Sequence, residues 1–85
     1  MDQANLKRIT IDPRVMVGKP VIRGTRIPVA LILKMLGQGI PVEEILREYP
    51  RLGKADIRAA MAYAAHVVEH EDVFPLPALN EAVPA

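Results

Sequence analysis

Apolar residues in this chain alternate with polar ones near the N-terminus and follow a helical period in the rest. The alternation predicts a short strand over residues 7–11, with Ile9 and Ile11 on its buried face. It continues over residues 15–17, and Val21–Ile22 forms a second extended piece. The pattern therefore predicts a short N-terminal β ribbon.

Three further apolar repeats predict helices over residues 29–37, 42–49 and 54–70. The first is apolar on nearly all sides, so it must be covered from more than one direction. The second is amphipathic, and the third is rich in alanine, which lets another helix approach closely. The short turn over residues 50–53 between the last two is compatible with a helix-turn-helix arrangement. We predict a mainly α, three-helix helix-turn-helix (homeodomain-like) domain with a short N-terminal β ribbon.

The segment from residue 18 to residue 28 holds two glycines, two prolines and three basic residues. Proline fixes φ near about −65° and glycine permits the positive φ of a tight turn. We therefore expect a strand, a glycine-centred turn and an extended piece that enters the first helix, with Pro28 at its first position. The residues assigned to this structural turn are Gly18, Pro20, Gly24 and Pro28.

The net charge of +1 is unevenly distributed. Residues 1–40 carry a net charge of +5 and residues 41–85 one of −4. Two candidate surfaces for DNA or a partner protein follow: the ribbon, with Lys19, Arg23, Thr25 and Arg26, and the start of the third helix, with Arg51, Lys54 and Arg58. The ribbon is the preferred DNA surface because it lies in the basic half. The alternative is that these cations pair with the acidic half or with a partner protein.

The composition argues against an enzyme. The chain has no cysteine and no serine, so the common nucleophile-and-base arrangements lack their central residue. His66 and His70 are four residues apart, but no third ligand is placed beside them, so we assign no metal and no cofactor. The N-terminus lacks a signal-peptide pattern and the longest apolar run is too short to cross a bilayer, so we expect a cytoplasmic protein without a membrane partner.

The segment from residue 18 to residue 28, with its Gly-Thr-Arg-Ile-Pro core, resembles the signature of a prokaryotic family known as domain of unknown function 433. The resemblance covers roughly residues 8 to 68, and continues through Leu36-Gly37-Gln38-Gly39-Ile40, Glu43-Glu44-Ile45-Leu46, Tyr49-Pro50 and Asp56-Ile57-Arg58-Ala59-Ala60. It implies a compact helix-turn-helix domain with an N-terminal β element, in a family whose members often look like antitoxin partners of nuclease-like toxins. Pro41 and Gly53 depart from the family pattern, which usually has a serine or threonine helix cap there.

These observations lead to one functional hypothesis and one alternative. The hypothesis is an antitoxin-like protein that binds a nuclease-type toxin, with its own promoter DNA as a second candidate ligand. The alternative is a protein-interaction or dimerisation module with no DNA-binding activity. We expect a disordered N-terminus over 1–5, one domain over 6–72 and a proline-containing tail over 73–85 that is flexible or docks elsewhere. We also expect a homodimer, with an interface formed by Ile9, Ile11, Ile32 and Leu36.

Overall fold

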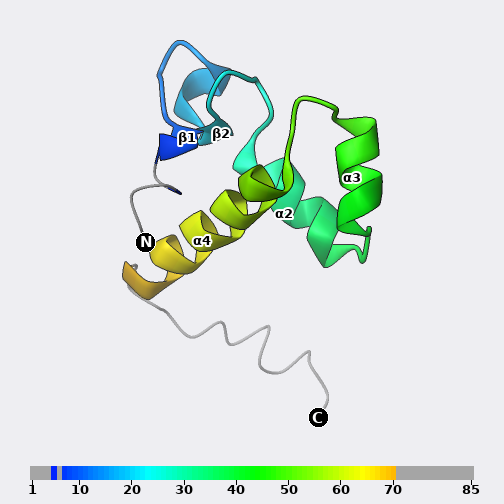
Figure 1. Ribbon diagram of the computed structural model, residues 1–85. Coiled ribbons are helices and arrows are strands. Elements are labelled where there is room, and N and C mark those ends of the chain that lie inside the picture. The colour runs from blue at the N-terminus through cyan, green and yellow to red at the C-terminus, as the bar shows by residue number, and fades with distance from the viewer. Residues whose placement is uncertain (1–4, 6, 71–85) are drawn as a thin grey trace.

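The computed structural model describes residue 5 and residues 7–70. Two short strands form an antiparallel pair, and three helices pack beside it (Figure 1). This architecture confirms the predicted mainly helical fold with an N-terminal β ribbon. The predicted ends, 1–5 and 73–85, lie outside the described residues except for Asn5. In chain order the elements are β1 (Ile9–Thr10), the 3-10 turn η1 (Met16–Gly18), β2 (Val21–Ile22), α2 (Val29–Gly37), α3 (Val42–Glu48) and α4 (Lys54–His70).

The ribbon is shorter than the alternating pattern predicts. Ile9 pairs with Ile22 and Thr10 pairs with Val21, so each strand has two residues. The pairing stops because the chain turns at Asp12, whose carbonyl accepts the Val15 N–H at 2.8 Å. Ile9 is buried as predicted, but Ile11 is 57% exposed, so its assignment to the buried face is wrong.

The loop between the two strands holds an unusual backbone conformation. Residues 15–17 were expected to be extended, but Met16 and Val17 have φ values of 52° and 56°. This left-handed region is rare for a β-branched residue because its Cβ crowds the backbone. The loop closes through a hydrogen bond from the Lys19 N–H to the Met16 carbonyl at 3.2 Å. The prediction failed because alternation does not reveal a backbone reversal.

The segment after β2 forms the predicted glycine-centred turn. Gly24 has a φ of +79°, and the Ile22 carbonyl accepts the Thr25 N–H at 3.0 Å. The chain then runs back along β2, where the Ile22 N–H donates to the Ile27 carbonyl at 3.0 Å. Pro28 precedes α2 as its N-cap residue, with φ −69° and ψ 143°, so it lies one position before the predicted one.

The helix ends follow local rules closely. α2 and α4 have the predicted bounds, and α3 ends one residue earlier than predicted. α2 closes with Gly39 at a φ of +82°, where the Gly39 N–H donates to Leu36 and the Ile40 N–H donates to Met35. This pair of bonds is a Schellman motif, which satisfies carbonyls at the end of a helix.

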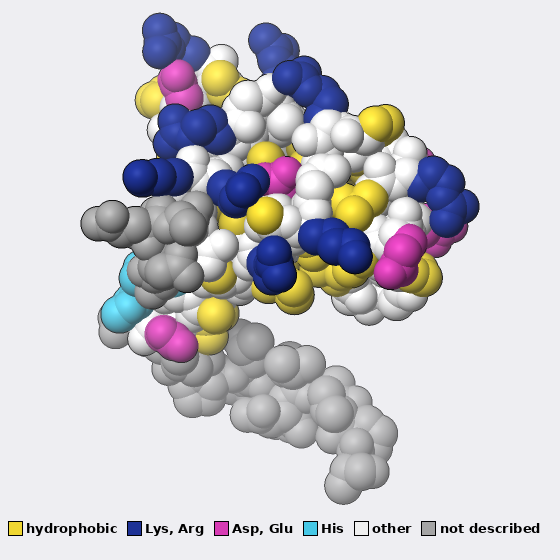
Figure 2. All heavy atoms as spheres, in the orientation of Figure 1, with side chains coloured by type: hydrophobic (Ala, Val, Ile, Leu, Met, Phe, Trp, Pro, Cys, Tyr) yellow, Lys and Arg dark blue, Asp and Glu magenta, His cyan; other side chains and the backbone are white. Residues whose placement is uncertain are grey.

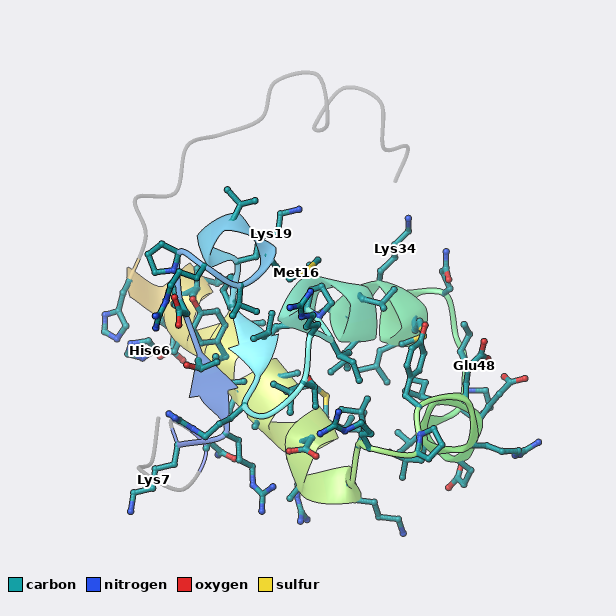
Figure 3. All side chains as sticks on the ribbon, turned by 90° about the horizontal axis from the view of Figure 1, so that it is seen from above. Lys7, Met16, Lys19, Lys34, Glu48 and His66 are labelled. Atoms are coloured by element: carbon teal, nitrogen blue, oxygen red, sulfur yellow. The ribbon has the colours of Figure 1, made fainter. Side chains whose placement is uncertain are left out.

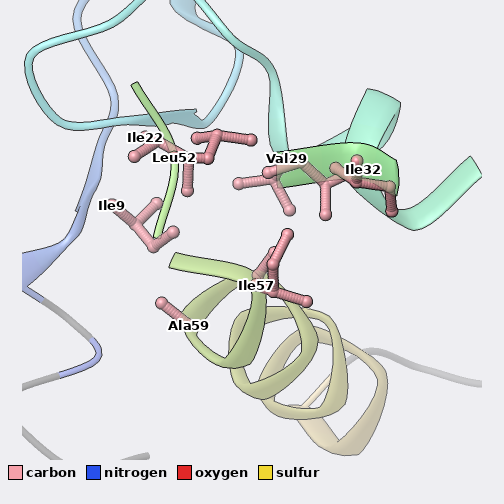
Figure 4. Packing of buried hydrophobic residues seen from close by; sticks show 9 residues of the cluster. Ile9, Ile22, Val29, Ile32, Leu52, Ile57 and Ala59 are labelled. Carbon is pink, nitrogen blue, oxygen red and sulfur yellow. The ribbon is translucent and has the colours of Figure 1, made fainter. Parts of the chain in front are cut away.

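The core is built from aliphatic side chains contributed by the ribbon, α2, α3, Leu52 and α4 (Figure 4). Ile32 of α2 is completely buried because α3 and α4 both pack against this helix. Packing within one chain therefore buries Val29 and Ile32 of α2, while Leu31, Leu33, Met35 and Leu36 stay partly exposed. Ile9 and Ile32, expected at a dimer interface, belong to the core of one chain, whereas Ile11 is accessible and Leu36 is partly so.

Candidate nucleic-acid interface

The start of α4 is fixed to the ribbon by one buried carboxylate. Asp56 is 8% exposed, and its Oδ2 accepts the Gly53 N–H at 2.9 Å. Its Oδ1 accepts a hydrogen bond from Arg8 Nη1 at 3.1 Å. Asp56 thus forms half of a capping box, which compensates for the lack of a serine or threonine at position 53. The same side chain sets the position of α4 relative to β1.

A second long-range contact joins the two candidate surfaces. Arg51, just before α4, donates from Nη2 to the Gly24 carbonyl at 2.9 Å. Arg23, the residue before Gly24, donates from its Nε to the Lys7 carbonyl. The ribbon turn and the entrance to α4 are therefore neighbours in space, although the sequence presents them as alternatives.

Lys and Arg side chains gather on one face, over the ribbon and the start of α4 (Figure 2). We use the name basic face for five basic residues of these two segments: Arg8, Arg23, Arg51, Lys54 and Arg58. All five are exposed. Lys54 and Arg58 are one helical turn apart in the first part of α4, which follows α3 and a short turn.

Lys19 does not join this face. Seen from above, Lys19 lies beside the Met16 loop and points to the same side of the molecule as Lys34, whereas Lys7 points to the opposite side (Figure 3). The predicted cluster of Lys19, Arg23 and Arg26 on one ribbon surface is therefore divided. Arg23 belongs with Lys7, to whose carbonyl it is hydrogen-bonded.

Thr25 has an internal role in the turn. Its hydroxyl donates to the Ile22 carbonyl at 2.7 Å and accepts the Ile27 N–H at 3.0 Å. Both bonds hold the turn closed around Gly24. Gly18, at the end of η1, also has a φ of +79°.

A groove of about 540 Å³ opens beside this turn. Its lining residues come from three separate segments of the chain: Thr10, Asp12, Val15, Gly24, Thr25, Arg26 and Arg51. Asp12 is paired with Arg14, whose Nη2 lies 3.0 Å from the Asp12 Oδ2. Hydrogen bonds from the side chain and backbone of Arg14 lower the pKa of Asp12 below its ordinary value of 3.8.

The rings of His66 and His70 lie next to each other on the last turns of α4, with centroids 4.3 Å apart and planes tilted by 60°. Within residues 5 and 7–70, no group of three or more His, Asp or Glu side chains could hold a metal ion. The described helices also include none with the length and apolar character needed to cross a bilayer.

The fold and this face define a small helix-turn-helix-like domain with a β ribbon. The family model described as "Protein of unknown function (DUF433)" matches residues 9–64. The chain therefore belongs to this family. A crystal structure of a DUF433 member protein from Anabaena variabilis is 39% identical, with a TM-score of 0.70 over 79% of this chain and 66% of that chain.

Two curated relatives are similar over shorter lengths. The uncharacterized protein y4eO of Sinorhizobium fredii is 39% identical over 56 residues, which are 66% of this chain and 25% of that protein. An uncharacterized protein of Archaeoglobus fulgidus is 67% identical over 24 residues, 28% of this chain and 67% of that protein. The chain thus spans about a quarter of the length of the first relative.

The basic residues were identified from the sequence. The Arg8–Asp56 pair, which positions α4 relative to β1, was not identified from it. An acidic residue three positions after Gly53 is the local signal for the helix cap. Nothing local signals its second partner, because Arg8 is 48 residues away in the chain.

Proposed function

We propose that this chain is an antitoxin-like protein that binds DNA through its basic face and restrains a nuclease-type toxin. The observation that carries the DNA-binding part is the Arg51–Gly24 hydrogen bond, which brings the ribbon and the start of α4 onto one surface. In helix-turn-helix proteins, the N-terminal residues of the second helix contact base edges. Lys54 and Arg58 occupy that position in α4.

The basic face suits the backbone of DNA. Arginine presents several N–H donors to phosphate oxygens, and each cation that neutralises a phosphate releases a counterion. In the described residues, Arg23, Lys54 and Arg58 form no ion pair with a carboxylate, so their charges are available to a ligand. Arg8 is different because it is paired with Asp56, and we assign it a positioning role.

The test is fluorescence anisotropy with a duplex from the region upstream of the gene, titrated at several salt concentrations. Lys54→Ala combined with Arg58→Ala should weaken binding and flatten the slope of log affinity against log salt by about two units, roughly one per phosphate contact. Lys19→Ala is the control for the loss of a cation, because Lys19 is an exposed lysine that points away from this face. Wild-type protein that shows no salt-dependent DNA binding would overturn the DNA-binding part.

The toxin-binding part rests on family resemblance and is tested separately. Co-expression of this chain with the product of the neighbouring gene should yield a complex and rescue growth that the partner alone inhibits. Absence of both complex and rescue would contradict this role while leaving the DNA-binding part intact.

An interaction module without DNA binding is the second candidate, and one observation favours it. Met16 and Val17 are exposed apolar residues at the tip of the loop before β2, with Val17 93% exposed. Exposed apolar residues at a loop tip are a common contact for another protein. This candidate is supported if Val17→Asp abolishes binding of the partner protein and the wild-type protein does not bind DNA.

A further inference from the structure

We propose that the groove beside Gly24 is a phosphate-binding site whose ligand is a nucleotide unit of a nucleic acid. Its walls are the segment from Thr10 to Val15, the turn at residues 24–26 and the side chain of Arg51. The choice of a nucleic acid as the source of the phosphate rests on the proposed DNA binding. A free nucleotide carries the same chemistry, and the experiment below separates these sources.

The charge balance of the groove favours an anion. Asp12 is the acidic residue in its lining, and Arg14 already neutralises that carboxylate through two side-chain hydrogen bonds. Within the described part of the chain, neither Arg26 nor Arg51 forms an ion pair. Two guanidinium groups therefore face the groove without a compensating charge. A phosphate can accept paired hydrogen bonds from such groups.

The geometry holds one of these guanidinium groups in place before a ligand arrives. Arg51 uses Nη2 to donate to the Gly24 carbonyl at 2.9 Å. A guanidinium has five N–H donors, so others are left for a second acceptor. A side chain that is already ordered loses less conformational freedom when it binds.

Gly24 presents main chain without a side chain at the edge of the groove. A Cβ built on Gly24 would meet no atom within 4 Å, so the position faces open space rather than a packed neighbour. A ligand can therefore approach the main chain of the turn closely. The groove volume of about 540 Å³ exceeds what a phosphate group needs, and Val15 supplies an apolar wall for an attached sugar.

The test compares three single substitutions in the full chain. Arg26→Ala and Arg51→Ala should each weaken binding of a fluorescein-labelled DNA duplex about tenfold, because each removes charged hydrogen bonds to phosphate. Each should also flatten the salt slope by about one unit. Arg47→Ala is the matched control, because Arg47 is an exposed arginine on α3 outside the groove lining.

Two further measurements, on Arg51→Lys and on thermal melting, distinguish a lost phosphate contact from a loss of fold stability. Arg51→Ala removes the bond to Gly24, so its melting temperature is measured first. Arg26 makes no hydrogen bond within the described residues, so Arg26→Ala tests the groove without that complication. Arg51→Lys should restore the salt slope but only part of the affinity, because lysine keeps the charge and lacks the planar fork.

The outcomes separate this proposal from the proposed function. If both alanine variants bind DNA as Arg47→Ala does, the groove is not a phosphate site, even where Lys54 and Arg58 matter for binding. If wild-type protein does not bind DNA, an NMR titration with adenosine monophosphate tests whether the groove binds a free nucleotide. Chemical-shift changes at Gly24 and Thr25 that disappear in Arg26→Ala would identify a free nucleotide as the ligand and refute DNA binding. Absence of those changes as well would refute the groove proposal.

Discussion

At the scale of single residues, Gly24 combines a conformational role with a contact role. Its φ of +79° closes the turn after β2, and its carbonyl accepts the hydrogen bond from Arg51. Because a Cβ at this position would meet open space, steric contact with neighbouring residues does not restrict it. The requirement for glycine therefore comes from the backbone conformation.

Gly24→Val should lower the free energy of unfolding by about 1 kcal/mol or more, and Gly24→Ala by less. Valine is β-branched and crowds the backbone at positive φ more than alanine does. Urea denaturation followed by circular dichroism measures both values. A neutral Gly24→Val would show that the turn can relax to a conformation with negative φ.

Val17 presents the opposite case, a β-branched residue at a φ of 56°. Because Val17 is 93% exposed, its replacement costs almost no buried apolar area. Val17→Asn should therefore raise the free energy of unfolding by about 0.5–1 kcal/mol, since asparagine tolerates the left-handed region. The same denaturation assay tests this, with the exposed Val68→Asn as the control for a change of polarity. A loss of stability would mean that the Val17 side chain makes stabilising contacts.

At the scale of elements, helices were predictable and the ribbon was less so. Helix bounds follow from local signals: the apolar period, Pro28 before α2, and Gly39 after it. The strand over 7–11 was too long because pairing depends on where the partner strand lies, and the turn at Asp12 ends it. The alternation over residues 15–17 predicted extended backbone there, which is wrong. No local sequence pattern indicates that Val17 has a positive φ.

Asp56 ties two of these elements together, which leads to a graded prediction. Asp56→Ala should destabilise the fold by about 1–2 kcal/mol, because it removes the helix cap and leaves Arg8 without its carboxylate. Arg8→Ala should cost less, since the arginine is half exposed and the Gly53 contact remains. Chemical denaturation of the two variants gives the order. Equal losses would mean that the ion pair, and not the cap, carries the effect.

At the scale of the whole molecule, two contacts that span 27 and 48 residues determine the candidate site. The sequence supplied the types of residue and the uneven charge, but it left the ribbon and the start of α4 as competing surfaces. It also placed Lys19 with Arg23, although the folded chain points Lys19 to the far side. Side-chain direction depends on the loop geometry at Met16 and Val17, which no periodicity encodes.

Assembly is the remaining prediction at this scale. We expect a symmetric dimer joined through the N-terminal ribbon, and the exposed Ile11 is the residue that tests it. Ile11→Asp should leave the circular dichroism and melting temperature near wild type but weaken dimerisation, because it places a charge on a surface residue that a partner would cover. Ile9→Asp is the contrasting variant: Ile9 is buried within one chain, so this change should unfold the protein rather than separate two copies. Sedimentation velocity measures both, and a compact wild-type monomer at concentrations on the order of tens of micromolar would rule the dimer out.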